Sequence, residues 1–467
     1  MFQWRVLHAD YAGKLGLALA HPLYIFLGKI LLLILLGSSA AKVNALSGIG
    51  MAVGLANMAI IGHRLTGRLW IGIATASMLS VTHTVWWLST IAEVYTWNAA
   101  FFTAELLALI SLIYAPRWHM AAALFLINGL NVSLHNLALL ALPVYGFVLL
   151  FLVAQKRLPV WTIIISVCAY SGGVSPYIAM TAALALAKGD VLGAVRSALF
   201  GNYASEVFNS TVTMSFGKIN AALASLNFIN FFLPFASIGW LYMKRRNGSL
   251  LAAALGAITI IEFLFYVRYP VPDQFTFIVP SLVMISLAAA VGIDILADVS
   301  PQWRRFVIVG CLFSMLVPPF AYAAGPKLIR NLGLEIKRDR ELPFRDEVRY
   351  WMVPWKQNEP SAELFAQAAL QQAAPLGIII CDSTSYYPLL LVQRRDRLFS
   401  RIVIMTDGEF RSHCEKNPLY PAALSQKHTL FLVSPALIFL PPGIKGTMTY
   451  SREAGRVLFC ITVTDTE

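Results

Sequence analysis

The sequence predicts an all-α, polytopic membrane protein that ends in a water-soluble α/β domain. Of its 467 residues, 58% are hydrophobic and only 13% are charged, whereas an ordinary soluble chain is about 25% charged. The charges are unevenly placed, because residues 327–467 contain 18 of the 36 basic and 15 of the 24 acidic residues. We therefore expect a transmembrane domain over residues 1–326 and a soluble α/β domain over residues 327–467.

Apolar stretches long enough for a bilayer, which needs about 20 residues, predict about ten spans. This composition excludes a soluble enzyme, a disordered chain and a fibrous repeat. The predicted spans cover residues 41–62, 69–89, 93–114, 119–131, 136–154, 160–185, 217–243, 249–267, 271–297 and 304–325. The fourth and fifth are short, and together they also fit one broken helix.

Basic residues fall in alternate loops, and this pattern sets the expected orientation. Cytoplasmic loops carry the excess of Lys and Arg. The rule places in the cytoplasm five clusters, at residues 63–68, 117, 156–157, 244–246 and 304–305. Glu93, the loop 202–215 and the C-terminal domain then face outward. The rule also explains most of the net charge of +12. The soluble domain shows no basic face with interleaved aromatic residues, so its charge does not predict nucleic-acid binding.

The apolar stretch 22–36 near the N-terminus is only about 15 residues long, shorter than the roughly 20 that a span needs, and it contains Lys29. We expect an interfacial helix on the outer surface, with the Lys29 ammonium reaching toward the headgroups. Residues 1–20 would then begin outside without a preceding span. Either a first transmembrane helix precedes Met1 or this segment crosses unaided, and we expect the missing helix.

The C-terminal part alternates helical and strand patterns, which predicts a small layered α/β domain. No GxGxxG or P-loop motif accompanies it, so no motif supports nucleotide binding. The predicted helix covers residues 362–374, and the predicted strands cover 377–381, 401–405, 429–433 and 457–463.

Ionisable side chains in or beside apolar spans cost about 2.5–3.5 kcal/mol each on insertion scales, so each suggests a role. Asp10 precedes the interfacial helix and is either a solvated carboxylate or a catalytic one. Glu93, followed by Tyr95, either favours a helix N-terminus or points into a cavity. His135 is either a satisfied polar residue or a donor to an anionic ligand. Glu105 and Glu262 lie deeper in their spans, and we expect them to make structural hydrogen bonds.

The turn at residues 266–273 holds Arg268 and Asp273. One interpretation is a surface ion pair, worth under about 1 kcal/mol. The other is a phosphate ligand with its orienting carboxylate, because a guanidinium matches phosphate oxygens bidentately. Both interpretations place the two side chains side by side.

Several sequence elements together resemble one family of membrane glycosyltransferases of the GT-C type. The most specific is WWLSTIAEVYTWN at residues 86–98, which is similar to the family's Ala-Glu-Val-Tyr-Thr signature. The others are the His-Ala-Asp to Gly-Lys stretch at 8–29, VNALS at 43–47, a glycine-then-histidine turn at 129–135, and a Tyr-Asp-Phe segment at 269–277. The family includes the eukaryotic transmembrane protein O-mannosyltransferase and many bacterial members.

The resemblance implies transfer of a sugar from a polyprenyl-phosphate donor to a protein hydroxyl or glycolipid acceptor on the outer face. It also implies a bacterial cytoplasmic membrane with the C-terminal domain outside. No cofactor is required, because the donor is already activated, although a carboxylate-bound divalent metal stays open. The expected catalytic residues are Asp10, as the base that takes the acceptor proton, and Glu93. The expected substrate-binding residues are Tyr95, His135, Arg268, Lys29 and His21.

A non-enzymatic function is the alternative, either as a lipid-linked sugar translocator or transporter, or as a membrane scaffold. A secondary transporter usually shows internal repeats, and we find no convincing repeat. The enzyme hypothesis predicts one outward cavity that joins Asp10, Glu93, His135 and Arg268, with a lateral opening for a prenyl chain. It further predicts that residues 343–356 make the contact of the soluble domain with this cavity.

Overall fold

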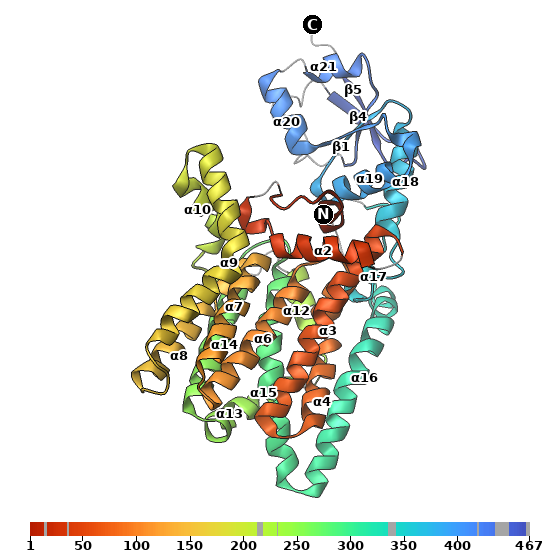
Figure 1. The fold of residues 1–467 in the computed structure, drawn as a ribbon. Coiled ribbons are helices and arrows are strands. Elements are labelled where there is room, and N and C mark those ends of the chain that lie inside the picture. The colour runs from red at the N-terminus through yellow and green to blue at the C-terminus, as the bar shows by residue number, and fades with distance from the viewer. Residues whose placement is uncertain are drawn as a thin grey trace. The chain divides into compact units, whose positions relative to one another are not determined.

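The computed structural model describes residues 1–467 except 14–15, 35–36, 213–217, 231, 335–341, 418–419, 435–447 and 464–467. Contacts divide the chain into two units, and each is described by itself. The membrane unit contains residues 2–326 and 352–356, and the C-terminal unit contains residues 1, 327–351 and 357–467. Figure 1 labels the elements of both units.

The membrane unit consists of helices (Figure 1). Eight helices among the described residues are long and apolar enough to cross a bilayer, so the protein is an integral, multi-pass membrane protein. They are η1–α2 (Leu17–Ile34), α3 (Ser39–Thr66), α6 (Tyr95–Tyr114), η2–α8 (Asn136–Ala154), α9 (Trp161–Lys188), α14 (Ser249–Arg268), η3–α15 (Gln274–Val299) and α16 (Pro301–Asn331). The shorter ones are α1 (Phe2–His8), α4 (Leu69–Ser80), α5 (His83–Thr90), α7 (Trp118–Leu134), α10 (Val191–Phe200), α11 (Ala204–Val207), α12 (Lys218–Leu226) and α13 (Phe232–Asn247).

Two of the predicted spans are pairs of shorter helices. Residues 69–89 form α4 and α5, and residues 217–243 form α12 and α13. The first break occurs at Thr82, whose main chain is extended. Asn227 accepts a hydrogen bond from the Thr84 N–H at 2.8 Å and donates to the Thr84 hydroxyl at 2.9 Å. A distant side chain therefore satisfies the helix N-terminus that the break creates.

The helix α2 (Pro22–Ile34) lies across the ends of α3, α7 and α9 rather than alongside them (Figure 1). The sequence predicts an interfacial helix here, whereas Leu17–Ile34 has the length and composition of a span. On one side a Cβ at Gly28 would lie 2.6 Å from a Val6 methyl, so α1 packs closely there. On the other side Leu33 and Ile34 are exposed, which suits a lipid-facing surface.

Small residues let the helices of the membrane unit approach one another closely. A Cβ at Gly129 of α7 would lie 2.4 Å from the Tyr170 carbonyl of α9. A Cβ at Gly239 of α13 would lie 1.8 Å from the Ala288 carbonyl of α15. Close backbone contact at small residues is how helices associate in a bilayer, where apolar burial gives little driving force.

The basic loops gather at one end of the membrane unit, which we call the basic end. Arg68 and Arg246 both pair with the buried carboxylate of Asp294, at 3.0 and 2.7 Å. Next to them, the Asn247 amide donates to the Tyr114 hydroxyl at 3.0 Å. Because α6 runs from Tyr95 to Tyr114, its other end, which we call the Glu93 end, lies opposite to these charges.

The C-terminal unit contains a five-stranded sheet of order β2-β1-β3-β5-β4. The strands β2, β1 and β3 are parallel, and β5 pairs antiparallel with both β3 and β4. Four of the strands lie where the sequence predicts strands, and β4 was missed. The strands are β1 (Ile378–Cys381), β2 (Val403–Thr406), β3 (Leu430–Leu432), β4 (Met448–Ser451) and β5 (Phe459–Val463). The helices are α17 (Glu347–Met352), α18 (Ser361–Ala373), α19 (Ser383–Arg395), α20 (Asp407–Lys416) and α21 (Tyr420–Ser425), and η4 is Arg397–Phe399.

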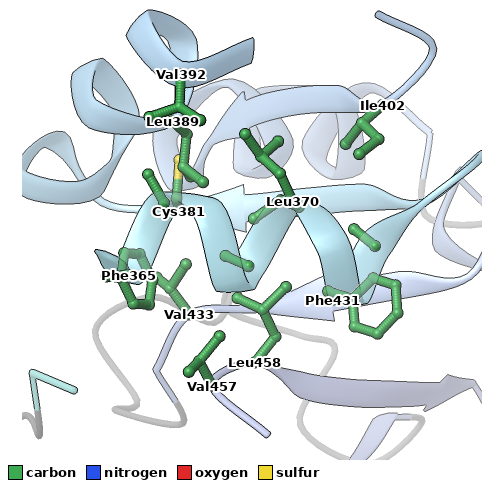
Figure 2. Close-up of a cluster of buried hydrophobic side chains, with 14 of the residues drawn as sticks. Phe365, Leu370, Cys381, Leu389, Val392, Ile402, Phe431, Val433, Val457 and Leu458 are labelled. Atoms are coloured by element: carbon green, nitrogen blue, oxygen red, sulfur yellow. The ribbon is translucent and has the colours of Figure 1, made fainter. Parts of the chain in front are cut away.

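Successive residues of β1 face opposite sides of the sheet, so the sheet has two apolar faces. Ile379 and Cys381 belong to a cluster with α18 and α19, which Figure 2 shows. Ile378 and Ile380 belong to a second cluster, with α20. Helices cover both faces, which explains why β1 is an unbroken apolar run.

Residues 352–356 belong to the membrane unit. The Thr90 hydroxyl donates to the Pro354 carbonyl at 3.0 Å, and the Trp355 ring lies 5.1 Å from that of Trp86. The Lys356 ammonium lies 3.8 Å from the centre of the Trp87 ring. Residues 354–356 are thus bound at the Glu93 end, next to α5.

Candidate active site

A hydroxyl of α3 holds the connection between α5 and α6, in which Glu93 lies. The Ser47 hydroxyl accepts a hydrogen bond from the Glu93 N–H and donates one to the Glu93 carbonyl, both at 2.9 Å. Because this uses the only Ser47 proton, the phenol of Tyr24 must donate to Ser47, over 3.2 Å. The main chain of Glu93 is thus fixed by α3 and α2, while its side chain is half-buried.

Four rings from separate elements meet at the first turn of α6, next to Glu93. The imidazoles of His21 and His135 stack, with centroids 5.1 Å apart and planes 24° apart. The Tyr95 ring lies 5.2 Å from His135 and 5.3 Å from Phe277. The Tyr95 hydroxyl donates to the Asp273 carboxylate at 3.3 Å. Tyr95 therefore joins the histidine pair to a second carboxylate.

The hydrogen bonds of the two histidines assign their protons. His21 Nδ1 lies 2.6 Å from the Leu134 carbonyl, which can only accept, so Nδ1 carries a proton. His135 Nδ1 accepts from the Leu137 N–H at 3.1 Å, so the neutral ring carries its proton on Nε2. Burial lowers the pKa of His135 to about 4. His135 is therefore a neutral donor at physiological pH rather than a cation.

The Glu93 carboxyl is held in its neutral form by its surroundings. Burial raises its pKa to about 8, and the negative charge of Asp273 adds to the rise. Below this pH Glu93 is a carboxylic acid that can donate a hydrogen bond.

A buried guanidinium organises the loop that carries Asp10. Arg5 is only 2% exposed, and its guanidinium donates to four main-chain carbonyls. These are the carbonyls of Asp10 at 3.1 Å, Tyr11 at 3.1 Å, Leu19 at 2.9 Å, and Ala20. The Asp10 carboxylate accepts from the Gly13 N–H at 2.9 Å and lies 3.7 Å from the guanidinium. Its side chain is 40% exposed. Since Ala20 precedes His21, Arg5 links the Asp10 loop to the ring cluster.

The expectation that Arg268 and Asp273 form a pair was wrong. The Arg268 Nε donates to the Asn209 carbonyl at 2.9 Å, and the Asn209 amide donates back to the Arg268 carbonyl at 2.7 Å. Asp273 instead accepts from Tyr95, and no ion pair joins it to Arg268 in the described part of the chain. The turn at residues 269–271 separates the two side chains. Arg268 thus faces the loop 202–215 rather than its own turn.

The structure therefore brings together four of the seven predicted site residues, Glu93, Tyr95, His135 and His21. Asp10 is connected to them through Arg5, and Arg268 through Tyr269, whose ring lies 4.9 Å from Phe277. Lys29 is half-buried on α2, without a contact to this group among the described residues. Across those residues no set of three His, Cys, Asp or Glu is placed to hold a metal ion.

Sequence reasoning missed Arg5 and Ser47 as site residues. Ser47 occurred in one of the family-like elements, but nothing local shows that it binds Glu93, 46 positions away. Arg5 looked like one more basic residue near the N-terminus. A signal was present, because Arg5 lies between the apolar residues Trp4 and Val6, where an arginine is costly unless it is fully bonded.

No family model matches the chain, and no curated protein is similar to it in sequence. Solved structures do match it. The crystal structure of ArnT from Cupriavidus metallidurans bound to undecaprenyl phosphate aligns with all of this chain and 93% of its own, with a TM-score of 0.54 and 12% identity. Its apo state aligns over the same shares, with a TM-score of 0.52 and 12% identity. The chain has the GT-C fold.

The alignment with the ArnT structure covers both units of the chain. It does not single out the O-mannosyltransferase family, to which the sequence elements are similar. One fold supports many activities, so the GT-C fold must be read together with the residues placed at the Glu93 end.

Proposed function

We propose that this protein is a membrane glycosyltransferase that moves a sugar from a polyprenyl-phosphate donor to an acceptor hydroxyl on the outer face. The acceptor is a protein or a glycolipid. The chain lies in a bacterial cytoplasmic membrane as a transmembrane domain of residues 1–326 followed by an extracytoplasmic domain of residues 327–467. The observation that carries the proposal is the shared GT-C fold with a structure that binds undecaprenyl phosphate.

The site supports the proposal by its position and by its charge. Its carboxyls and histidines lie at the Glu93 end, opposite to the basic end, and the positive-inside rule places the basic end in the cytoplasm. The site then opens on the side where a lipid-phosphate sugar is the available donor, because nucleotide sugars stay inside.

The proposed reaction is a single displacement with inversion. The acceptor oxygen attacks the anomeric carbon as the bond from that carbon to the phosphate oxygen breaks. The electron pair of this bond leaves with the polyprenyl phosphate, and Asp10 takes the acceptor proton. Asp10 suits this role because it is half-exposed, acceptor-only when ionised, and fixed by the Gly13 N–H.

The remaining predicted residues hold the substrates. Arg268 and the Nε2–H of His135 would bind the donor phosphate and stabilise it as it leaves. His21 keeps the His135 ring in place by stacking. Glu93, as a neutral acid, and Tyr95 would bind sugar hydroxyls, and Lys29 would act at longer range on the phosphate.

An apolar groove near this site suits the prenyl chain. It has a volume of about 580 Å³ and lies along α10 and α11. The α10 helix is tied to the chain just before His21, since the Leu17 N–H donates to the Ser197 hydroxyl at 3.1 Å. The groove is lined by Leu192, Val195, Arg196, Leu199, Phe200 and Phe208.

The test is turnover by the purified protein in nanodiscs with a panel of radiolabelled polyprenyl-phosphate sugars. We expect release of polyprenyl phosphate and loss of label from the lipid with at least one donor. A translocator would leave every donor intact while moving it between leaflets. If every donor stayed intact while the protein moved it across the bilayer, the proposal of a glycosyltransferase would be wrong.

The proposed orientation predicts which parts of the chain an impermeant reagent reaches. In intact cells, a maleimide that cannot cross the membrane should label a cysteine placed at Ser205 and one placed at Glu415. A cysteine placed at Arg117 should react only after permeabilisation. The native cysteines are replaced first, and the reverse pattern of labelling would invert the topology and the proposed site with it.

The raised pKa of Glu93 predicts an alkaline limit to donor binding. A carboxyl pKa raised to about 8 means that the neutral form persists below pH 8 and is lost as the pH rises through it. The charge then repels the donor phosphate, so KM for the donor should rise by roughly tenfold per pH unit above 8. Glu93→Gln keeps a neutral hydrogen-bond donor, so KM for the donor should no longer rise above pH 8. A wild-type KM that stays flat from pH 7 to 10 would contradict the assignment.

A further inference from the structure

A second apolar groove, which the proposed reaction does not use, lies between two of the membrane-spanning helices. The helices α8 and α14 lie side by side (Figure 1), and a groove of about 310 Å³ runs between them. Each helix contributes one face, because the lining positions are spaced by three or four residues. Its lining is apolar throughout and includes Val144 and Phe147 of α8 and Leu250, Ala253, Ala254 and Ala257 of α14.

The alanines of α14 leave this groove open instead of closing it. Elsewhere in the membrane unit small residues bring helix backbones together, as Gly239 does against Ala288. Here Phe147 is 62% exposed. A Cβ at Gly146, next to it on α8, would meet no described atom within 4 Å. The groove therefore opens toward the lipid and suits a hydrocarbon chain.

The chain segments next to both helices meet at the basic end of this groove. Arg157, three residues beyond α8, donates to the Ile113 carbonyl at 3.3 Å. Asn247, two residues before α14, donates to the Tyr114 hydroxyl at 3.0 Å. Ile113 and Tyr114 are the last two residues of α6, so the segment after α8 and the segment before α14 lie at the same place.

These two segments carry exposed cations that have no ion-pair partner among the described residues. They are Lys156, Lys244 and Arg245. The neighbouring Arg246 differs, because it pairs with Asp294 at 2.7 Å. Neither segment 155–160 nor segment 244–249 contains an acidic residue. The basic end of the groove is therefore positively charged.

Aromatic residues show the depth at which these cations lie. Trp118 and Trp161 are 45% exposed, and their ring centroids are 5.6 Å apart. Exposed tryptophans of a membrane protein lie at the level of the lipid headgroups, and Trp161 follows Lys156 by five residues. We propose that the groove binds one anionic glycerophospholipid, with an acyl chain between α8 and α14 and its phosphate at Lys156, Lys244 and Arg245.

A bound lipid would hold α8 in place, and α8 is linked by hydrogen bonds to the candidate site. Glu105 makes the structural hydrogen bonds that its depth predicts, because it accepts from the Tyr145 hydroxyl at 2.9 Å and from Asn131 at 2.7 Å. The Asn131 carbonyl accepts from the His135 N–H at 2.7 Å. The inference does not rest on the proposed glycosyl transfer, because lipid binding is measured without turnover.

The test is native mass spectrometry of the full-length protein in detergent, titrated with phosphatidylglycerol or with phosphatidylcholine of identical acyl chains. We expect one phosphatidylglycerol to bind at least about tenfold more tightly than phosphatidylcholine. The double substitution Lys156→Gln and Lys244→Gln should weaken phosphatidylglycerol binding by roughly thirtyfold. The matched control, Arg304→Gln with Arg305→Gln, removes two exposed charges at the start of α16 and should leave the binding unchanged.

A third variant tests the place of the acyl chain. Ala257→Phe fills the groove and should weaken phosphatidylglycerol binding by about tenfold or more, because it removes the space that the chain would occupy. Ala183→Phe, at an exposed position of α9, is its control and should bind as the wild type does.

Four outcomes would overturn the proposal. The two lipids could bind equally, or both double substitutions could weaken binding to the same extent, and either result would mean that no headgroup site exists at Lys156 and Lys244. Full affinity in Ala257→Phe would place the acyl chain elsewhere. Glycerol phosphate that bound as tightly as the whole lipid would show a site for the headgroup alone.

Discussion

Asp10→Asn is expected to abolish turnover while leaving donor binding nearly unchanged. The substitution keeps an oxygen that can accept from the Gly13 N–H, so the loop conformation should persist. It removes the lone pair that would take the acceptor proton in the transition state. General-base catalysis contributes about 10²–10⁴-fold, so kcat should fall by that factor with little change in KM.

The measurement compares kcat for polyprenyl-phosphate release with donor affinity determined separately by binding. Asp396→Asn is the matched control, because Asp396 caps η4 in the C-terminal unit through an oxygen that asparagine also has. It should leave both quantities unchanged. If Asp10→Asn retains more than about a tenth of the wild-type kcat, another group takes the proton.

Hydropathy and charge were enough to predict the membrane protein, because both are averages over many residues. Short apolar runs predicted four strands of the C-terminal sheet. The helix breaks were not predictable in the same way. The stretch 69–89 is mostly apolar and long enough for one span, and its break falls in the polar run Thr-His-Thr at residues 82–84. The helix start after the break is stabilised by Asn227, which bonds Thr84 from 143 positions away. Apolar composition sets where a helix is tolerated, while tertiary hydrogen bonds set where it stops.

The same limit applies to the site. Glu93, Tyr95 and His135 were predicted because ionisable and aromatic groups at span ends are costly or unusual, and the structure places them together. Arg268 and Asp273 were expected to pair because they are close in sequence. Asp273 binds Tyr95 instead, 178 positions away. The strand β4 was missed because MTYS, an edge strand of four residues, has too little pattern to be recognised.

Arg5→Ala is expected to be the most destabilising single change near the site. Arg5 is buried and satisfies four main-chain carbonyls between residues 10 and 20. Each buried carbonyl that loses its partner costs roughly 1–3 kcal/mol. Among the described residues of this loop, only the single turn of η1 is helical, so few main-chain bonds would replace those to Arg5. We expect a loss of about 3 kcal/mol or more in unfolding free energy, and a displaced Asp10 even in the protein that stays folded.

Two measurements separate these consequences. The apparent Tm of Arg5→Ala in detergent should fall well below that of Arg117→Ala, in which an exposed arginine at the basic end is removed. Limited proteolysis in the membrane should cut the loop 9–13 faster in Arg5→Ala alone. Arg5→Lys should give an intermediate result, because a single ammonium cannot reach the four carbonyls that the planar guanidinium reaches. If Arg5→Ala matched the control in both measurements, the loop would be held by its other contacts, such as the Leu17 bond to Ser197, and Asp10 would keep its position without Arg5.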